Sequence, residues 1–252
     1  MDRINKIYRV YRECIANGMM GVPFIRNWRV RRGRTMSDNT NDQVQNVLGQ
    51  FDFFIRSIGW ENVRDKTVIE IGPGDAIPHG LLFLGAGAKK YIAVDRFSGN
   101  VSSVSAEHLY RALIESAPKR LCQGWHERGL HPHQYPWLEA ANSSPRIKLV
   151  TKSIEEVDLE ESEQADIIVS FNVIEHLSNV TQAFERMAKC LNPSGLMAHR
   201  VDYGPHGYAW KNPLEFLTLS NTVWGLMGSN RGWPNRLRHS QDIAGFREQW
   251  FQ

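Results

Sequence analysis

The 252-residue sequence has no apolar run as long as the roughly 18 residues that a membrane-spanning helix needs. Its N-terminus, MDRINKIYRVYREC, lacks the apolar core of a secretory signal. Cysteine is scarce, and Cys14, Cys122 and Cys190 are odd in number, widely spaced and without a CxxC pair. These absences argue against a membrane protein, a disulfide framework and a zinc cluster. We therefore expect a cytoplasmic protein with reduced, mostly buried thiols.

A strong excess of charge of one sign is also missing. The chain has 30 Lys and Arg against 27 Asp and Glu, and a net charge of +3 does not indicate a nucleic-acid-binding protein as a whole. Basic residues do gather locally, because five arginines lie between Arg26 and Arg34, beside Trp28. Guanidinium groups bind phosphates, so this segment is either a contact for RNA, a nucleotide-linked sugar or a lipid surface, or a solvated arm.

Two helices are predicted before residue 60. Apolar side chains recur at helical spacing over residues 4–15, and Gly18 is a plausible end for that helix. The pattern i, i+3, i+4, i+7 repeats over residues 44–58, and Gly59 is typical of a helix end. We interpret residues 1–59 as an N-terminal helical cap that includes the basic segment.

Short apolar runs alternate with helical stretches after residue 60. The predicted strands are residues 67–71, 91–95, 147–150, 166–171 and 196–201, and Asn-Pro-Ser-Gly at 192–195 is predicted to end the helix before the last of them. Such alternation is typical of an α/β fold, a doubly wound, mostly parallel sheet, here over residues 60–252. Residues 97–146 exceed what one crossover helix needs, and we interpret them as an inserted lid.

A glycine turn follows the first predicted strand in the sequence Glu70-Ile71-Gly72-Pro73-Gly74-Asp75. Glycine lets the backbone turn sharply and approach a ligand, because no β-carbon intrudes. Asp95 closes the second predicted strand, where a carboxylate can accept hydrogen bonds from both hydroxyls of a ribose. A dinucleotide fingerprint would have a third glycine where the sequence has Ile77, which disfavours pyrophosphate binding.

The segments VIEIGPGD, AVDR, ADIIVSFNVIEHL and FERMAKCLNPSG, within residues 60–202, resemble the class I (Rossmann-like) S-adenosylmethionine-dependent methyltransferases. The resemblance implies S-adenosylmethionine as cofactor. The cofactor residues that it implies are Glu70, Gly72, Pro73, Gly74 and Asp75 around the methionine portion, Asp95 and Arg96 at the ribose, Ser153 and Ile154 at the adenine, and Asn172 and Val173 at the reactive end. The family normally ends with two more strands, one of them antiparallel, and the sequence after residue 202 predicts neither.

Methyl transfer requires mainly alignment and exclusion of water, and a base only when the acceptor must lose a proton. His176 follows the fourth predicted strand and is the first candidate base, although it could instead be structural. His199, Asp202 and His206 follow as a second group after the fifth predicted strand. They could bind the acceptor, relay a proton, hold a metal or order a loop, and we assign no metal to them.

The sequence thus predicts a methyltransferase that acts on a hydroxyl group of a small molecule or of a sugar or glycan precursor, with residues 203–252 as a tail on the acceptor side. Three alternatives stay open. They are an RNA methyltransferase that uses the Arg26–Arg34 segment, an NAD-dependent oxidoreductase, and a non-catalytic cofactor-binding scaffold. The oligomeric state does not follow from the sequence.

Overall fold

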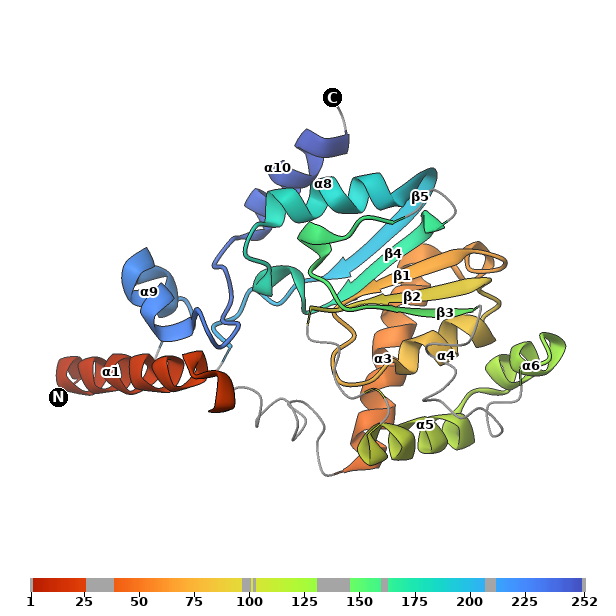
Figure 1. Cartoon of the computed structure of the whole chain (residues 1–252), viewed down its shortest axis with the longest axis horizontal. Coiled ribbons are helices and arrows are strands. Elements are labelled where there is room, and N and C mark those ends of the chain that lie inside the picture. Colours follow the sequence, from red (N-terminus) through yellow and green to blue (C-terminus); the bar gives the residue numbers. More distant parts are fainter. Residues whose placement is uncertain are drawn as a thin grey trace. The chain divides into compact units, whose positions relative to one another are not determined.

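The computed structural model describes residues 2–25, 39–96, 101, 103–130, 146–159, 163–206 and 212–250, so the Arg26–Arg34 segment lies outside the described residues. The chain divides into two compact units, and Figure 1 shows their elements. The smaller unit consists of Met1–Arg32, Asn172–Val180 and Val201–Gln252, and the larger one of Gly33–Phe171 and Thr181–Arg200. Neither unit is a continuous stretch of sequence, whereas the sequence predicted a single boundary at residue 59.

A five-stranded parallel sheet forms the centre of the larger unit. Its strands are β1 (Thr67–Ile71), β2 (Lys90–Val94), β3 (Ile147–Val150), β4 (Ala165–Phe171) and β5 (Leu191–Arg200). Their order is β3-β2-β1-β4-β5, and every neighbouring pair is parallel. The predicted α/β fold class is confirmed. Because β1 pairs with both β2 and β4, the strand order reverses at β1, and ligands of such sheets bind beyond the carboxyl ends of the strands at this point.

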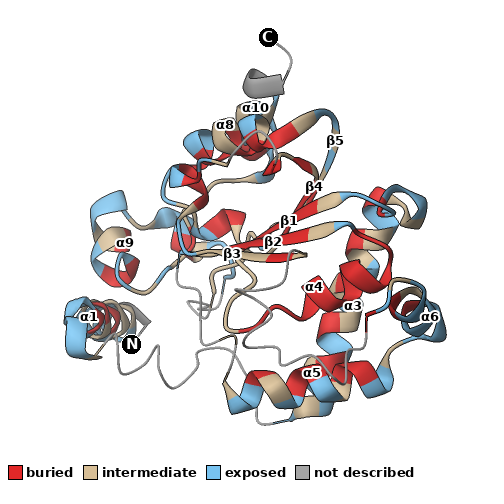
Figure 2. Cartoon of the chain, turned by 45° about the vertical axis from the view of Figure 1, so that its right-hand side comes forward, coloured by how far each residue is buried: buried red, intermediate tan, exposed pale blue. Residues whose placement is uncertain are grey.

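Helices cover both faces of this sheet. Figure 1 shows α3, α4 and α5 on one face and α8 on the other. The helices of the larger unit are α3 (Thr40–Ile58), α4 (Pro78–Gly85), α5 (Val104–Ser116), α6 (Lys119–Glu127) and α8 (Val180–Cys190). Figure 2 shows that the buried positions concentrate in the strands and in α4, all of whose residues are buried. The predicted helix over residues 44–58 is confirmed, and its apolar positions, among them Val44, Phe51 and Phe54, face the core.

Part of the predicted lid belongs to the core of the larger unit. Ser103 caps α5 by accepting a hydrogen bond from the Ala106 amide at 3.1 Å. In α6, Leu121 and Trp125 are 1% and 3% exposed, and the Trp125 indole donates to the Leu81 carbonyl at 2.9 Å. The described residues 103–130 are therefore packed helices, while residues 131–145 lie outside the described part of the chain.

Strand β5 begins at Leu191 rather than at the predicted residue 196. Leu191 pairs with Ala165, and Leu196 pairs with Ile167, with an irregularity between the two pairs. The Asn-Pro-Ser-Gly stretch that was predicted to end the preceding helix lies inside this irregular start, because α8 ends earlier, at Cys190. No further strand occurs in the described residues from 201 to 250.

The smaller unit is helical in its described part. Its elements are α1 (Asp2–Gly21), η5 (Ile174–His176), η6 (Glu215–Thr218), α9 (Asn221–Gly228) and α10 (His239–Trp250). The aromatic tail residues pack together, since Phe216, Trp224 and Met227 form a buried cluster with Trp233 against it. The Trp224 indole donates to the Pro234 carbonyl at 2.7 Å. These tail aromatics therefore serve as core residues of the smaller unit.

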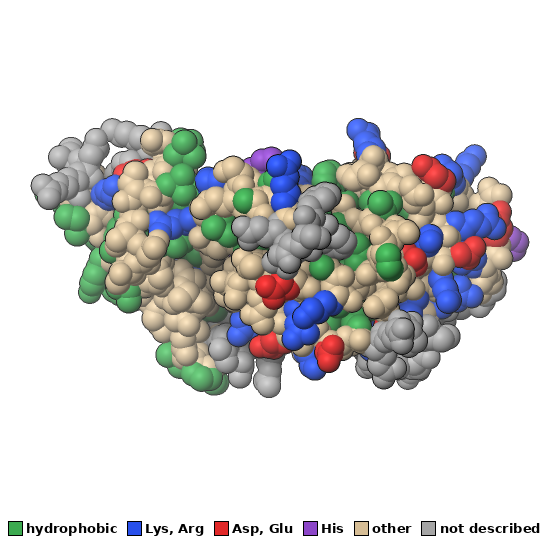
Figure 3. All heavy atoms as spheres, turned by 90° about the horizontal axis from the view of Figure 1, so that it is seen from above, with side chains coloured by type: hydrophobic (Ala, Val, Ile, Leu, Met, Phe, Trp, Pro, Cys, Tyr) green, Lys and Arg blue, Asp and Glu red, His purple; other side chains and the backbone are tan. Residues whose placement is uncertain are grey.

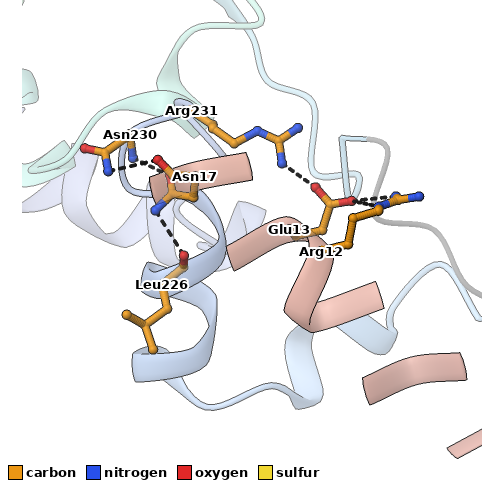
Figure 4. A network of polar contacts seen from close by, with 6 residues as sticks. All are labelled: Arg12, Glu13, Asn17, Leu226, Asn230 and Arg231. Carbon is orange, nitrogen blue, oxygen red and sulfur yellow. Dashed lines mark hydrogen bonds and ion pairs between the residues drawn. The ribbon is translucent and has the colours of Figure 1, made fainter. Parts of the chain in front are cut away.

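A polar network joins α1 to the tail (Figure 4). The Asn17 side chain donates to the Leu226 carbonyl at 3.0 Å and accepts from the Asn230 amide at 2.7 Å. Glu13 pairs with Arg231 and with its neighbour on α1, Arg12. Because Asn17 and Glu13 are 4% and 8% exposed, these bonds satisfy polar groups that would otherwise be costly to bury.

The opposite face of α1 is apolar and exposed. The stripe that predicted this helix consists of Ile4, Ile7, Tyr8, Tyr11 and Ile15, which are 74%, 62%, 67%, 63% and 47% exposed. Exposed colouring marks α1 and α9 in Figure 2, and Figure 3 shows hydrophobic side chains at the surface at the left-hand end, where these two helices lie in Figure 1. The helix itself is confirmed and continues beyond Gly18 to Gly21.

All three cysteines are free thiols, of which Cys190 is buried, Cys14 is half-buried and Cys122 is exposed. The expectation of mostly buried thiols holds only in part. Among the described residues, no helix combines the length and the apolar character that crossing a membrane requires.

Candidate functional site

The glycine turn lies at the carboxyl end of β1, where the strand order reverses. Gly72 and Gly74 have φ values of 68° and 82°, in the left-handed region that favours glycine. The Gly72 amide donates to the Val94 carbonyl at the end of β2, at 2.8 Å. A β-carbon at position 74 would have no atom within 4 Å, so the backbone there faces open space. Pro73 and Asp75 complete a turn that a ligand can approach closely.

The structure brings Asp95 to this turn. The Gly74 amide donates to Asp95 Oδ2 at 3.0 Å, so the two predicted motifs are in direct contact although they are 21 residues apart. Arg96 directly follows Asp95 in a turn. Here open backbone lies beside a carboxylate, which suits a nucleoside because the hydroxyls of its ribose need hydrogen-bond acceptors. The turn has no further phosphate-binding glycine, so a ligand whose tail carries no phosphate fits it better than a dinucleotide. These residues fit S-adenosylmethionine.

The two residues predicted at the adenine follow the neighbouring strand β3. Val150, the last residue of β3, pairs with Val94 and accepts a hydrogen bond from the Asp95 amide at 3.1 Å. Ser153 donates to Glu155, and Ile154 is 2% exposed. Both residues thus follow a strand that ends at the same edge of the sheet as the glycine turn.

Glu70 is directed into the core of the larger unit. It is 3% exposed and accepts hydrogen bonds from the Tyr91 hydroxyl at 2.5 Å and from His79 Nδ1 at 2.8 Å. Burial, followed by the Glu70 charge, raises the pKa of Tyr91 above its ordinary value. Both oxygens of Glu70 therefore bind side chains within the unit. Tyr91 and His79 were not predicted as partners of Glu70, although a glutamate inside an apolar strand signals buried partners.

Asn172 and Val173 belong to the smaller unit, unlike the other predicted cofactor residues. Asn172 adopts a φ of 56°, which asparagine tolerates better than most residues. Its side-chain oxygen is buried and has no hydrogen-bond partner in the described part of the chain. Such an atom commonly marks a place where a ligand or water completes the hydrogen bonding.

Four of the chemically active side chains of the smaller unit lie together. Glu175, His176 and His206 each offer a ligand atom, and these atoms lie within 4.8 Å of one another. The His206 Nε2 atom is 3.7 Å from Glu175 Oε1 and 3.2 Å from Asp202 Oδ2. The two imidazole rings have centroids 4.8 Å apart at an angle of 66°.

His199 does not belong to this cluster. It lies on β5 in the larger unit, where its Nδ1 is 2.8 Å from the Ser170 hydroxyl. The chain passes from the larger to the smaller unit between Arg200 and Val201. The predicted group of His199, Asp202 and His206 is thus divided between the two units.

The electrostatic environment differs among these groups. Glu175 is 3% exposed, and burial raises the pKa of its carboxyl group to about 7. His176 is exposed as a residue, but partial desolvation of its ring and repulsion from His206 lower its pKa. Burial lowers the pKa of His199 to about 4. Both His176 and His199 are therefore neutral near pH 7.

Glu175 was not predicted as a site residue, although its place beside His176 was a signal. Asn235, which holds the η5 turn from a distant part of the sequence, was not predicted either. The side-chain amide of Asn235 donates to the Ile174 carbonyl at 3.0 Å, and its backbone N–H donates to the Glu175 carbonyl at 2.6 Å. No local pattern could have indicated this contact.

Comparisons with known structures give distant similarities. A putative S-adenosylmethionine-dependent methyltransferase from Listeria monocytogenes is 16% identical over 61% of this chain, with a TM-score of 0.38, and the chain spans 55% of that protein. YcgJ from Bacillus subtilis is 17% identical over 80% of this chain and 67% of its own, with a TM-score of 0.46. A putative methyltransferase from Bacillus halodurans is 12% identical over 80% of this chain and 68% of its own, with a TM-score of 0.47.

No curated protein matches the sequence. Residues 47–241, by contrast, match the family described as a methyltransferase domain, which is well over half of the chain. This match excludes the NAD-dependent oxidoreductase alternative as the family assignment. The chain belongs to the methyltransferase-domain family, and the prediction of a class I S-adenosylmethionine-dependent methyltransferase is confirmed.

Proposed function

We propose that the protein transfers the methyl group of S-adenosylmethionine to a hydroxyl group of a small molecule or of a sugar or glycan precursor. The assignment of S-adenosylmethionine as methyl donor rests on the contact between the Gly74 amide and the Asp95 carboxylate, at the place where the strand order of the sheet reverses. It supports a nucleoside site in which the ribose lies on Asp95 and the remainder of the ligand lies along the glycine turn.

The remaining donor contacts are part of the same proposal. Gly72, Pro73 and Asp75 would border the methionine portion, and Arg96 would flank the ribose. Ser153 and Ile154 would border the adenine. The cofactor, when bound, supplies an electrophilic methyl group on a positively charged sulfur. Glu70 would act indirectly, because its carboxylate already binds Tyr91 and His79 and so orders the end of β1.

A hydroxyl acceptor is favoured by the bases of the smaller unit. A hydroxyl group must lose its proton when it is methylated, and a neutral imidazole can take up that proton. Desolvation and the neighbouring His206 lower the pKa of His176, so its ring is unprotonated and able to act as a base at pH 7. We assign His176 as the candidate base, with Asp202 and His206 beside it as acceptor-binding groups. The enclosed His199 ring is assigned a positioning role through Ser170.

The donor assignment predicts that Asp95→Asn weakens S-adenosylmethionine binding. Asparagine can still accept a hydrogen bond from the Gly74 amide, but it lacks the negative charge that strengthens the hydrogen bonds from the ribose hydroxyls. We expect a loss of about 1.5–3 kcal/mol, or roughly ten- to hundredfold in Kd, by titration calorimetry. Glu107→Gln on α5 is the control, since Glu107 pairs with Arg111 on the same helix and with no other ionised side chain among the described residues. An unchanged Kd for Asp95→Asn would refute the ribose assignment.

The acceptor assignment is tested by a screen with isotopically labelled S-adenosylmethionine and detection of products by mass spectrometry. The panel contains small alcohols, sugars, nucleotide-linked sugars and RNA. Labelled product from a hydroxyl compound is the expected result. Labelled RNA would instead establish the alternative acceptor, and donor binding without any labelled product across the panel would overturn the proposed acceptor class.

A further inference from the structure

We propose that Glu175, His176 and His206 form a binding site for a divalent transition-metal cation. The three side chains come from two places in the smaller unit. Glu175 and His176 are adjacent in the η5 turn, and His206 follows β5 across a short loop. Their ligand atoms lie within 4.8 Å of one another, close enough for one cation to contact all three after small side-chain adjustments.

Burial of the carboxylate is the second observation. Glu175 is 3% exposed, and its Oε2 atom is buried without a hydrogen-bond partner in the described part of the chain. Its other oxygen accepts a long bond from the Asp202 amide at 3.3 Å. Removing a carboxylate from water is costly unless a cation or hydrogen bonds compensate. A bound cation would satisfy the unpartnered oxygen.

The charges around the cluster also favour a cation. Asp202 Oδ2 lies 3.2 Å from the same His206 nitrogen that faces Glu175, so two carboxylates approach one imidazole. No lysine or arginine forms an ion pair with either carboxylate in the described residues. The charge of these two acids is balanced either by a proton, since burial raises the pKa of Glu175 to about 7, or by a metal ion, and titration with metal separates these two cases.

The local backbone presents the ligands in advance. Asn235 fixes the η5 turn through the carbonyls of Ile174 and Glu175. Asp202 accepts from the Gly204 amide at 2.7 Å, which shapes the loop that leads to His206. Preformed ligands lower the entropic cost of metal binding.

The donor set determines the kind of metal. Two imidazoles and one carboxylate are ligands of zinc and related transition metals, whereas magnesium prefers oxygen ligands and water. Three protein ligands leave at least one coordination position open, and an oxygen donor such as a hydroxyl group can occupy it. A His176 that binds the cation cannot also take up the acceptor's proton, so with the metal bound the cation itself would lower the pKa of a coordinated hydroxyl group. The metal site does not depend on the identity of the methyl acceptor.

The test is titration calorimetry of chelator-treated full-length chain with Zn²⁺ and, separately, Mg²⁺. We expect saturable binding of a single Zn²⁺ and at least about tenfold weaker binding of Mg²⁺. Glu175→Gln and His206→Asn should each weaken Zn²⁺ binding by about tenfold or more. Asparagine suits position 206, where φ is 45°, so this variant is expected to keep the fold, as circular dichroism will check.

His126→Gln is the matched control, because His126 is an exposed histidine on α6 outside the cluster. Co²⁺ serves as a spectroscopic probe, since thiolate ligands give an intense near-ultraviolet band that imidazole and carboxylate ligands lack. Absence of that band would support the assigned ligands, and its presence would transfer the site to a cysteine such as the exposed Cys122. Equal Zn²⁺ affinity in folded His206→Asn and in wild type would overturn the proposal and leave a proton as the counter-charge. None of these readouts uses methyl transfer or S-adenosylmethionine.

Discussion

His199 shows how enclosure changes the chemistry of one side chain. Its ring lies against Ser170, and burial lowers its pKa from 6.5 to about 4. Above pH 6.5 the ring is neutral in both the folded and the unfolded chain. As the pH falls below 6.5, the unfolded chain takes up a proton that the folded chain does not, so the stability of the fold decreases toward pH 4.

This linkage gives a prediction for His199→Gln. Between pH 7.5 and 5.0 the wild type should lose about 2 kcal/mol of unfolding free energy through this histidine, and the variant should not. Glutamine can still bond to Ser170. Urea denaturation at both pH values measures the difference, and His126→Gln, at an exposed histidine, should retain the pH dependence of the wild type. Parallel pH profiles for wild type and His199→Gln would contradict the buried, neutral state of the ring.

Individual residues differed in how well the sequence could predict them. Asp95 could be placed beside the glycine turn, because parallel strands end at the same edge of a sheet. The direction of Glu70 could not, since a strand residue may face either surface and its partners, Tyr91 and His79, lie on other elements. His199 and Asp202 are three positions apart, yet the path of the chain assigns them to different units.

At the scale of elements, α4 and α6 approach each other through glycine. A β-carbon on Gly124 would lie 1.8 Å from the Gly85 carbonyl oxygen, far inside van der Waals contact. Trp125 donates to the Leu81 carbonyl beside this contact and fixes the two helices at short distance. Both glycines are therefore needed for packing, and their helical propensity is secondary.

Gly124→Ala should accordingly destabilise the fold by about 1–3 kcal/mol or more, because α6 must move away from α4. Gly49→Ala in α3 is the matched control. A β-carbon there meets no atom within 4 Å, so alanine should stabilise its helix by about 0.5–1 kcal/mol. Chemical denaturation of both variants measures these opposite signs. A neutral or stabilising Gly124→Ala would show that the helices can separate at no cost.

Periodicity predicted elements better than it predicted their surroundings. It located α1 and α3 because both carry apolar residues at helical spacing. In α3 the apolar face is buried, whereas in α1 Ile4, Ile7 and Tyr8 are exposed and the side that carries Asn17 is the packed one. A pattern reports which residues share a face, but the identity of the packed face depends on partners that are distant in the sequence.

At the scale of the whole molecule, the sequence predicted the sheet and its class but not the division of the chain. The strands recur at regular intervals and carry a local signal. The smaller unit is assembled from three separate stretches, and its contacts join α1 to residues more than 200 positions later, such as Asn17 with Leu226 and Asn230. No motif encodes a contact of this kind.

The Asn17 contacts also affect how the protein is made. During synthesis, α1 leaves the ribosome 209 residues before the carbonyl of Leu226 that completes its hydrogen bonding. The sheet, whose last strand ends at Arg200, can emerge and close before that partner exists. The polar groups of α1 that are buried in the folded protein must then stay hydrated, or be bound by a chaperone, through most of translation. The first helix to be synthesised is therefore among the last to pack in its final place.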